Sequence, residues 1–268
     1  MKHVLRALRW ATIILWILLV FLVITLVYSA FNIGIDVGEP QFFVEDDRIT
    51  WAIPARINNN GGLYGIHDLN ITTIIEDADG AILLKSSSFV PLIPKQETHQ
   101  IWHNISISLE KIPNYQVYLT NDTDFIMKHS IRLNFGKVVP CFFIFNSTIP
   151  WGAPLYNLHV GELNCQFNAT HCIVSFNVGF ENHSPYINLN GTLKVEVLNQ
   201  NEEKMGMNSF PINVPPYQGN DNYPAYNETL TIPVDISKLT RSGKIRLTFQ
   251  TSMFSYETEV PYEFEEIF

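Results

Sequence analysis

Two histidines four residues apart are the first candidates for chemistry in this chain. His99 and His103 lie in a polar segment that runs directly into Ile105 and Ile107. On a helix, this spacing would let both rings bind one metal ion. The alternating apolar residues beside them predict a strand instead, on which residues four apart lie about 13 Å from each other. The pattern therefore predicts no metal site.

Other polar clusters lack the companions that catalysis needs. The turn Asp77–Gly80 begins like a calcium-binding loop but has no glutamate at the required distance. The serines at 86–88 have no Gly-x-Ser-x-Gly turn around them. We expect no catalytic residue, no metal and no cofactor, and therefore a protein that is not an enzyme.

Two of the three cysteines are placed to form a disulfide. Cys165 and Cys172 flank Asn168 and Ala169. A tight hairpin that pairs residue 167 with 170 would set the cysteines opposite each other, with Cβ atoms about 4.5–5.5 Å apart. Such a bridge is typical of an oxidising compartment. Cys141 is the odd cysteine, and we expect a buried thiol there ahead of an intermolecular bridge.

Asn-x-Ser/Thr acceptor sites are frequent, which favours a glycosylated outer surface over a merely Asn-rich strand-and-turn protein. Pro185 makes the site at Asn182 the weakest. The eight candidate asparagines are Asn70, Asn104, Asn121, Asn146, Asn168, Asn182, Asn190 and Asn227.

A polar, Gly- and Asn-rich loop carries three tyrosines, Tyr217, Tyr223 and Tyr226. Its composition resembles that of recognition loops. We expect it to contact a protein partner or, alternatively, carbohydrate. Most of the other aromatic residues, which make up 13% of the chain in total, are expected in the core.

An apolar block from Trp10 to Tyr28 follows Lys2, Arg6 and Arg9. As a helix it would be about 28 Å long, close to the hydrocarbon thickness of a bilayer. A cleaved signal peptide is the alternative, but its apolar core is usually shorter. We predict a cytoplasmic stub over 1–9 and a transmembrane signal-anchor over 10–30. The basic residues keep the N-terminus inside, so the rest of a single-pass cell-membrane protein lies outside.

The remainder of the chain is acidic. Residues 31–268 carry 14 basic and 26 acidic side chains, a net charge of −12. This charge repels nucleic acid, so no nucleic-acid partner is expected.

Beyond the apolar block, hydrophobic residues alternate with polar ones in short runs. Ile49, Trp51 and Ile53 form one run, and residues 174–180 form another. Alternation over four to eight residues, punctuated by Asn-, Gly- and Pro-rich turns, predicts half-buried strands. The fold class is therefore all-β, with two immunoglobulin- or fibronectin-like β-sandwiches after the helix.

The two sandwiches are predicted to be a duplication. Val37-Gly38-Glu39 recurs as Val160-Gly161-Glu162, and at the same offset of 123 residues Asn59 falls on Asn182. Prolines and a glycine at 140–154 interrupt the pattern. The expected division is a first sandwich at 32–138, a linker at 139–156 and a second sandwich at 157–268.

The strand ends at Ala55–Asn60 and Gly179–Pro185 resemble the late-embryogenesis-abundant type 2 domain, also called the WHy domain. The resemblance covers most of residues 37–264. It implies a seven-stranded fibronectin-like sandwich, often membrane-anchored and sometimes in tandem, with no catalytic residues. An unrelated immunoglobulin-like pair, as in archaeal surface or pilus-assembly proteins, fits nearly as well.

These features together predict a membrane-tethered scaffold, adhesion or envelope-assembly module with a protein partner or a second copy of itself. Two alternatives stay open. One is binding or transfer of an apolar ligand in a groove of the sandwiches, and the other is a role as accessory subunit of a larger membrane complex.

Overall fold

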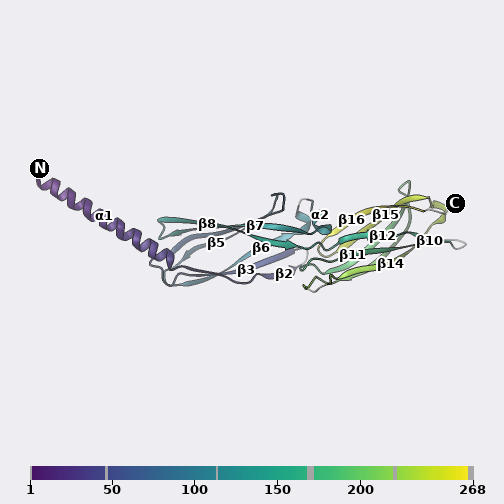
Figure 1. The fold of residues 1–268 in the computed structure, drawn as a ribbon, viewed down its shortest axis with the longest axis horizontal. Coiled ribbons are helices and arrows are strands. Elements are labelled where there is room, and N and C mark those ends of the chain that lie inside the picture. The colour runs from purple at the N-terminus through teal and green to yellow at the C-terminus, as the bar shows by residue number, and fades with distance from the viewer. Residues whose placement is uncertain (1, 46–47, 113, 168–171, 220–221, 265–268) are drawn as a thin grey trace.

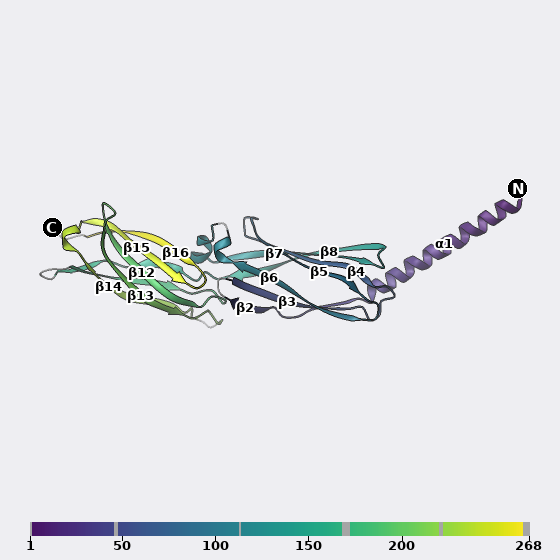
Figure 2. The same cartoon turned by 180° about the vertical axis from the view of Figure 1, so that it is seen from behind.

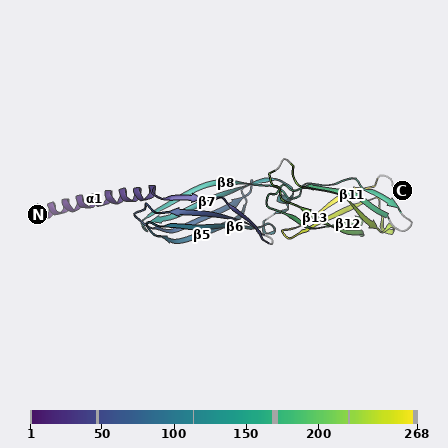
Figure 3. The ribbon, with the colours of Figure 1, turned by 90° about the horizontal axis from the view of Figure 1, so that it is seen from below.

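The computed structural model describes residues 2–45, 48–112, 114–167, 172–219 and 222–264. The molecule is elongated. One long helix leads into a first group of strands, and a second group follows end to end, as three views agree (Figures 1, 2 and 3). We call residues 34–151 the first half and residues 156–263 the second half.

Helix α1 spans Lys2–Phe31, and its portion Arg6–Phe31 is long and apolar enough to cross a membrane. Apolar side chains project on all sides of it, including Trp10, Trp16 and Phe21, which are each more than 60% exposed. An apolar surface on all sides is compatible with a membrane span, and the anchor over 10–30 stays a prediction.

Two sheets face each other in the first half. In one sheet, β1 and β2 both pair with β3, and β3 pairs with β6; the second sheet has the order β5-β4-β7-β8. All pairs are antiparallel. The strands are β1 Gly34–Val37, β2 Gln41–Glu45, β3 Arg48–Asn58, β4 Ile66–Glu76, β5 Ile82–Ile93, β6 Thr98–Ser108, β7 Thr123–Phe135 and β8 Val139–Trp151.

The second half repeats this order of pairing. β9 and β10 both pair with β11, which pairs with β14, and the other sheet runs β13-β12-β15-β16. The four sheets stay separate. The strands are β9 Tyr156–Val160, β10 Asn164–Phe167, β11 Cys172–Glu181, β12 Leu189–Asn199, β13 Lys204–Val214, β14 Ala225–Val234, β15 Ser242–Thr251 and β16 Ser255–Glu263. Short helices η1 Leu109–Lys111, α2 Gln116–Thr120 and η2 Ile236–Lys238 complete the elements.

Alternation in the sequence identifies the buried face of the central strands correctly. Ile49 and Trp51 on β3 are buried, and Ile53 packs at the edge of the core. The alternate residues of β11 from Val174 to Phe180 are at most 2% exposed. Each sandwich buries one face of each strand, and the pleat sends every second side chain to it.

The expectation of a linker over residues 139–156 is wrong for most of that range. Residues 139–151 form β8, a long strand at the edge of its sheet. Pro140 and Pro150 are compatible with this strand because, among the described strands, β8 pairs only with β7. The nitrogen that cannot donate can therefore face away from the ladder. Only four residues separate β8 from β9.

The apolar core is continuous across the two halves. One buried cluster runs from Ile49 and Trp51 through Trp151 to Phe180 and Phe249. A second, smaller cluster fills the end of the first half beside α1. Its partly buried neighbours include Leu26 and Ile33 at the end of the helix, so α1 is packed against the first half.

A buried asparagine occupies the same corner of each half. Asn59 donates from Nδ2 to the carbonyls of Tyr64 and Pro94, at 3.0 Å in both cases. Asn182 donates likewise to the carbonyls of Ile187 and Pro215. Both side chains are fully buried. The amide ties the end of β3 or β11 to the next turn and to the end of β5 or β13.

Candidate functional site

A surface groove lies where the two halves meet. We call it the junction groove; its volume is about 610 Å³. The first half contributes Asp122 and Trp151, which lie at the start of β7 and the end of β8. The second half contributes a turn after β11 and the loop between β13 and β14. Its principal lining residues are Asp122, Trp151, Gly152, His183, Tyr217 and Tyr223.

His183 is the centre of the polar contacts in the junction groove and is only 8% exposed. Its Nδ1 lies 2.7 Å from Asp122 Oδ2, and its Nε2 lies 3.0 Å from Glu181 Oε2. The other oxygen of Asp122 accepts a hydrogen bond from the Ala153 amide at 2.7 Å. The imidazole is therefore held between carboxylates from both halves.

Aromatic rings enclose the same imidazole. Tyr223 stacks on one side with ring centroids 3.6 Å apart, and Tyr156 stacks with centroids 4.1 Å apart. Tyr217 packs against Tyr223 at 4.4 Å. Gly152 lets its own backbone lie close to the backbone of His183, since a Cβ there would lie 2.0 Å from the His183 carbonyl oxygen.

The junction groove combines aromatic and proline walls with acidic groups. Asp122 and Asp124 line it, Pro150 and Pro185 flank it, and none of its described lining residues is a lysine or arginine. Such a surface can stack on a flat or apolar group and attract a cation. Among its described lining residues, no nucleophile is paired with a base.

The tyrosine loop predicted from sequence is divided by the structure. Tyr217 and Tyr223 come together in the junction groove. Tyr226 does not join them: it lies on β14, half-buried, with its ring stacked on Phe180 at 5.2 Å. His183 and Asp122 are not predicted from the sequence, because they are 61 residues apart and no motif links them.

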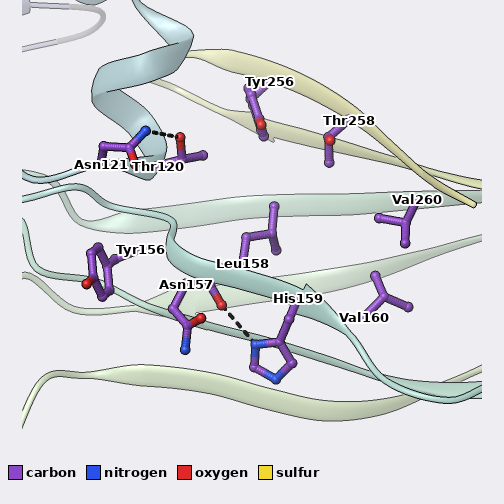
Figure 4. Close-up of a pocket in the computed structure, with 10 residues that line it drawn as sticks. All are labelled: Thr120, Asn121, Tyr156, Asn157, Leu158, His159, Val160, Tyr256, Thr258 and Val260. Atoms are coloured by element: carbon purple, nitrogen blue, oxygen red, sulfur yellow. Dashed lines mark hydrogen bonds between the residues drawn. The ribbon is translucent and has the colours of Figure 1, made fainter.

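A second groove, of about 390 Å³, opens between β9 and β16 beside α2 (Figure 4). Figure 4 shows His159 with its Nδ1 2.8 Å from the carbonyl oxygen of Asn157. Leu158, Val160 and Val260 supply its apolar wall. The groove lies between two edge strands that do not pair with each other.

A buried polar chain crosses the core of the first half from β5 to β8. It runs Ser88–His103–Thr73–His129–Ser147, with every link between 2.8 and 3.0 Å. Thr73, His103 and His129 are at most 7% exposed. The threonine hydroxyl bonds a nitrogen of each ring, so it donates to one neutral imidazole and accepts from the other.

Burial lowers the pKa of His103 to about 4, with a further contribution from the nearby His129. Burial also lowers the pKa of His129. Both rings are therefore neutral at pH 7. The strand registers and bulges of the second half place Val195, Leu230 and Leu247 where the first half has Thr73, His103 and His129. All three are almost fully buried, so this fold does not require polar residues there.

The cysteines are paired as predicted, but in a different strand register. Cys165 and Cys172 form a disulfide with Cα atoms 6.3 Å apart. In the hairpin, Cys165 lies opposite Val174, and Cys172 lies opposite Phe167. The cysteines are thus diagonal neighbours on one face, because the connection between the strands holds four residues instead of two. Cys141 is free and half-buried, and burial raises the pKa of its thiol.

The candidate glycosylation sites differ in accessibility. Asn182 is fully buried and uses its amide in the corner described above, so a glycan cannot be attached there in the folded chain. Asn70 is half-buried, and Asn168 lies outside the described residues. The exposed candidates are Asn104, Asn121, Asn146, Asn190 and Asn227.

Within the described ranges, no group of three or more His, Cys, Asp or Glu side chains is placed to hold a metal ion. His99 is exposed on β6, whereas His103 faces the core, where it belongs to the buried polar chain. Because the two histidines are four residues apart on one strand, they lie about 13 Å from each other.

No protein-family model matches this chain, and no curated protein matches it either. Solved structures give only distant similarity. Red sea bream transglutaminase aligns over 85% of this chain and 31% of its own, with 14% identity and a TM-score of 0.32. A glycosyl hydrolase family 2 member from Bacteroides cellulosilyticus DSM 14838 aligns over 80% and 28%, with 7% identity and a TM-score of 0.33. The chain thus spans less than a third of either protein.

Proposed function

We propose that this chain is a non-enzymatic, membrane-tethered module that binds a protein partner outside the cytoplasm. Its role is that of a scaffold, an adhesion module or an envelope-assembly module. Helix α1 is the anchor, and two similar β-sandwiches in series present the binding surface. The repeated strand order and the matching corners at Asn59 and Asn182 support a tandem relative of the late-embryogenesis-abundant type 2 domain.

Three independent features support an extracytoplasmic location. Basic residues precede the span and favour the cytoplasm for the N-terminus. A disulfide is typical of an oxidising compartment. Five acceptor asparagines are exposed. Protease added to intact cells should therefore degrade residues 32–268, and full protection until lysis would contradict this orientation.

The observation that carries the binding proposal is the junction groove. Aromatic residues dominate the energetics of protein interfaces, and the groove exposes Tyr223 next to the carboxylate of Asp122. The rings around His183 are already stacked on one another, so little side-chain entropy is lost on binding. A peptide segment with a basic or aromatic side chain fits these walls.

Photo-crosslinking from native membranes tests this proposal. A photoreactive residue in place of Gln218, which lines the junction groove, should capture one specific partner. Tyr223→Ala in the same chain should abolish the adduct, because it removes the exposed ring. Met207→Ala, at an exposed position on β13 away from the groove, should leave the adduct intact. Equal capture by all three chains would contradict the proposal.

Binding of an apolar ligand is a second candidate, supported by the first half. Phe143 and Phe145 alternate with outward residues on β8 and share a face with Ile149 of the core, yet they remain 50% and 47% exposed. An acyl chain could cover them. Mass spectrometry of solvent extracts from the purified chain would detect such a ligand, and Phe143→Ser should reduce its amount.

A further inference from the structure

We infer that the end of the first half beside α1 lies in the headgroup layer of the membrane that α1 spans, on its outer side. The inference rests on the proposed membrane anchor. The surface concerned is called the membrane collar here and consists of Leu63, Tyr64, Leu92, Lys137 and Val138. These residues lie on the β3–β4 loop, the end of β5 and the β7–β8 hairpin.

The last two turns of α1 are fixed to this surface by specific contacts. The Thr25 hydroxyl lies 2.8 Å from the Tyr64 hydroxyl, and the Leu63 amide donates to Ser29 Oγ at 3.1 Å. Ser29 is fully buried. A Cβ on Gly61 would lie 2.6 Å from Asn32 Cβ, which shows how closely the loop approaches the end of the helix.

Helix length then places the collar relative to the bilayer. Arg6 and Arg9 hold the start of the apolar block at the inner headgroups. From Trp10 to Thr25 the helix rises only about 22 Å, whereas the hydrocarbon core is about 30 Å thick. Spanning it requires the helix up to about Phe31. Thr25 therefore lies below the outer edge of the hydrocarbon core, and the loop whose Tyr64 hydroxyl reaches down to it lies in the headgroup layer.

The exposed chemistry of the collar suits that position. Three apolar side chains of the collar are exposed at loops or strand ends. Leu63 is 49% exposed, Leu92 is 44% exposed and Val138 is 69% exposed. Gly136 bonds Gly65 and lies against the Tyr64 ring, which brings the hairpin carrying Val138 to the same place. Tyrosine and lysine are typical of membrane interfaces.

Net charge does not drive the contact. Lys137 of the collar and the neighbouring Lys95 are exposed, but the exposed acidic residues Asp68 and Glu97 lie in the same region. Apolar burial and the tyrosine position are therefore the attraction, and phosphatidylcholine should serve as well as an anionic lipid. Electrostatic adsorption would instead depend on anionic lipid.

Depth-dependent quenching in phosphatidylcholine vesicles tests the inference on the full chain. In a Cys141→Ser background, Leu63→Cys and Val138→Cys are labelled with a small fluorophore. Ile82→Cys is the matched control, since Ile82 is 62% exposed on β5, about 33 Å along that strand from Leu92. Lipids with a nitroxide near the headgroup should quench the labels at 63 and 138 but not the label at 82.

Flotation of the same vesicles distinguishes a failure of the membrane collar from a failure of the proposed anchor. A labelled chain that floats with the lipid, but whose probes at 63 and 138 are quenched only by aqueous iodide, would overturn the collar and leave the anchor intact. A chain that does not float with the vesicles would overturn both.

Discussion

At the scale of single residues, the folded state depends on buried polar groups that find their hydrogen-bond partners inside the protein. The corner asparagine is the clearest example. Asn182 donates to the carbonyls of Ile187 and Pro215, with a longer contact to that of Val214, and its Oδ1 accepts from the Ser184 amide at 3.1 Å. Ile187 and Ser184 are fully buried, so water cannot replace the lost amide at these two residues. Asn59 occupies the equivalent corner, but its Oδ1 has no partner among the described residues.

We predict that Asn182→Ala lowers the free energy of unfolding by about 2–4 kcal/mol, because it leaves buried backbone groups unpaired. Denaturant titration of the full chain in detergent measures this change. Asn190→Ala, at an exposed acceptor site on β12, should stay within about 0.5 kcal/mol of the parent. A cost below 1 kcal/mol for Asn182→Ala would contradict the role assigned to the corner.

The buried polar chain gives a pH dependence with a defined sign. His103 has a pKa of about 4 in the folded chain, against about 6.5 when unfolded. Between these values the unfolded chain binds the extra proton. Stability is therefore full above about pH 6.5 and falls as the pH drops toward 4. His129 acts in the same direction because burial lowers its pKa as well.

We expect each histidine to contribute at most about 1.4 kcal/mol per pH unit to this slope. The triple variant Thr73→Val, His103→Leu, His129→Leu copies the equivalent residues of the second half and should remove this contribution. Unfolding titrations at pH 7 and pH 5 test the effect, with His99→Leu at the exposed start of β6 as control. An unchanged slope in the triple variant would refute the assignment.

At the scale of secondary-structure elements, β8 is a long edge strand that exposes several large apolar side chains. It is an edge strand of thirteen residues with no charged side chain. Phe142, Phe143, Ile144 and Phe145 are each 47–65% exposed. Long, uncharged edge strands are templates for pairing with another chain. We therefore expect the free edge of β8 either to pair with a second copy of the protein or to be covered by a glycan at Asn146.

We predict that Ile144→Lys reduces self-association of unglycosylated protein in detergent, because a charge at an edge opposes strand pairing. Its free energy of unfolding should change by less than about 0.5 kcal/mol, since the side chain is exposed. Sedimentation velocity measures the first effect and denaturant titration the second. Met207→Lys, exposed on β13, is the control. Equal sedimentation of all three proteins would argue against β8 as the contact.

The sequence predicts which strand faces are buried, because that depends on local alternation. It does not predict the contacts between distant segments. Alternation predicts the buried face of β3 and β11, and the offset between Asn59 and Asn182 predicts their equivalent corners. It does not predict that β8 is a strand, because Pro140 and Pro150 obscure the pattern and only the sheet edge makes them tolerable. Nor does it predict the pairing of His183 with Asp122, since this contact depends on how the two halves meet.

At the scale of the whole molecule, the two halves are held together by more than their connecting segment. Tyr186 of the second half packs against three rings of the first: Phe42 at 5.1 Å, Trp51 at 5.9 Å and Trp151 at 6.2 Å. His183 Nδ1 of the second half also lies 2.7 Å from Asp122 Oδ2 of the first. These contacts favour a stiff rod, which suits the scaffold role proposed above.

The junction also makes a prediction about cooperativity. All five tryptophans lie in α1 or the first half, so their fluorescence reports on that part, whereas far-ultraviolet circular dichroism reports on both halves. Because one buried cluster spans the halves, the two signals should give the same midpoint in guanidinium. Tyr186→Ala removes the shared ring and should separate the midpoints. Phe167→Ala, exposed at the far end of the second half, should not. Separate midpoints in the parent chain would mean that the halves fold independently and that the rod can bend at the junction groove.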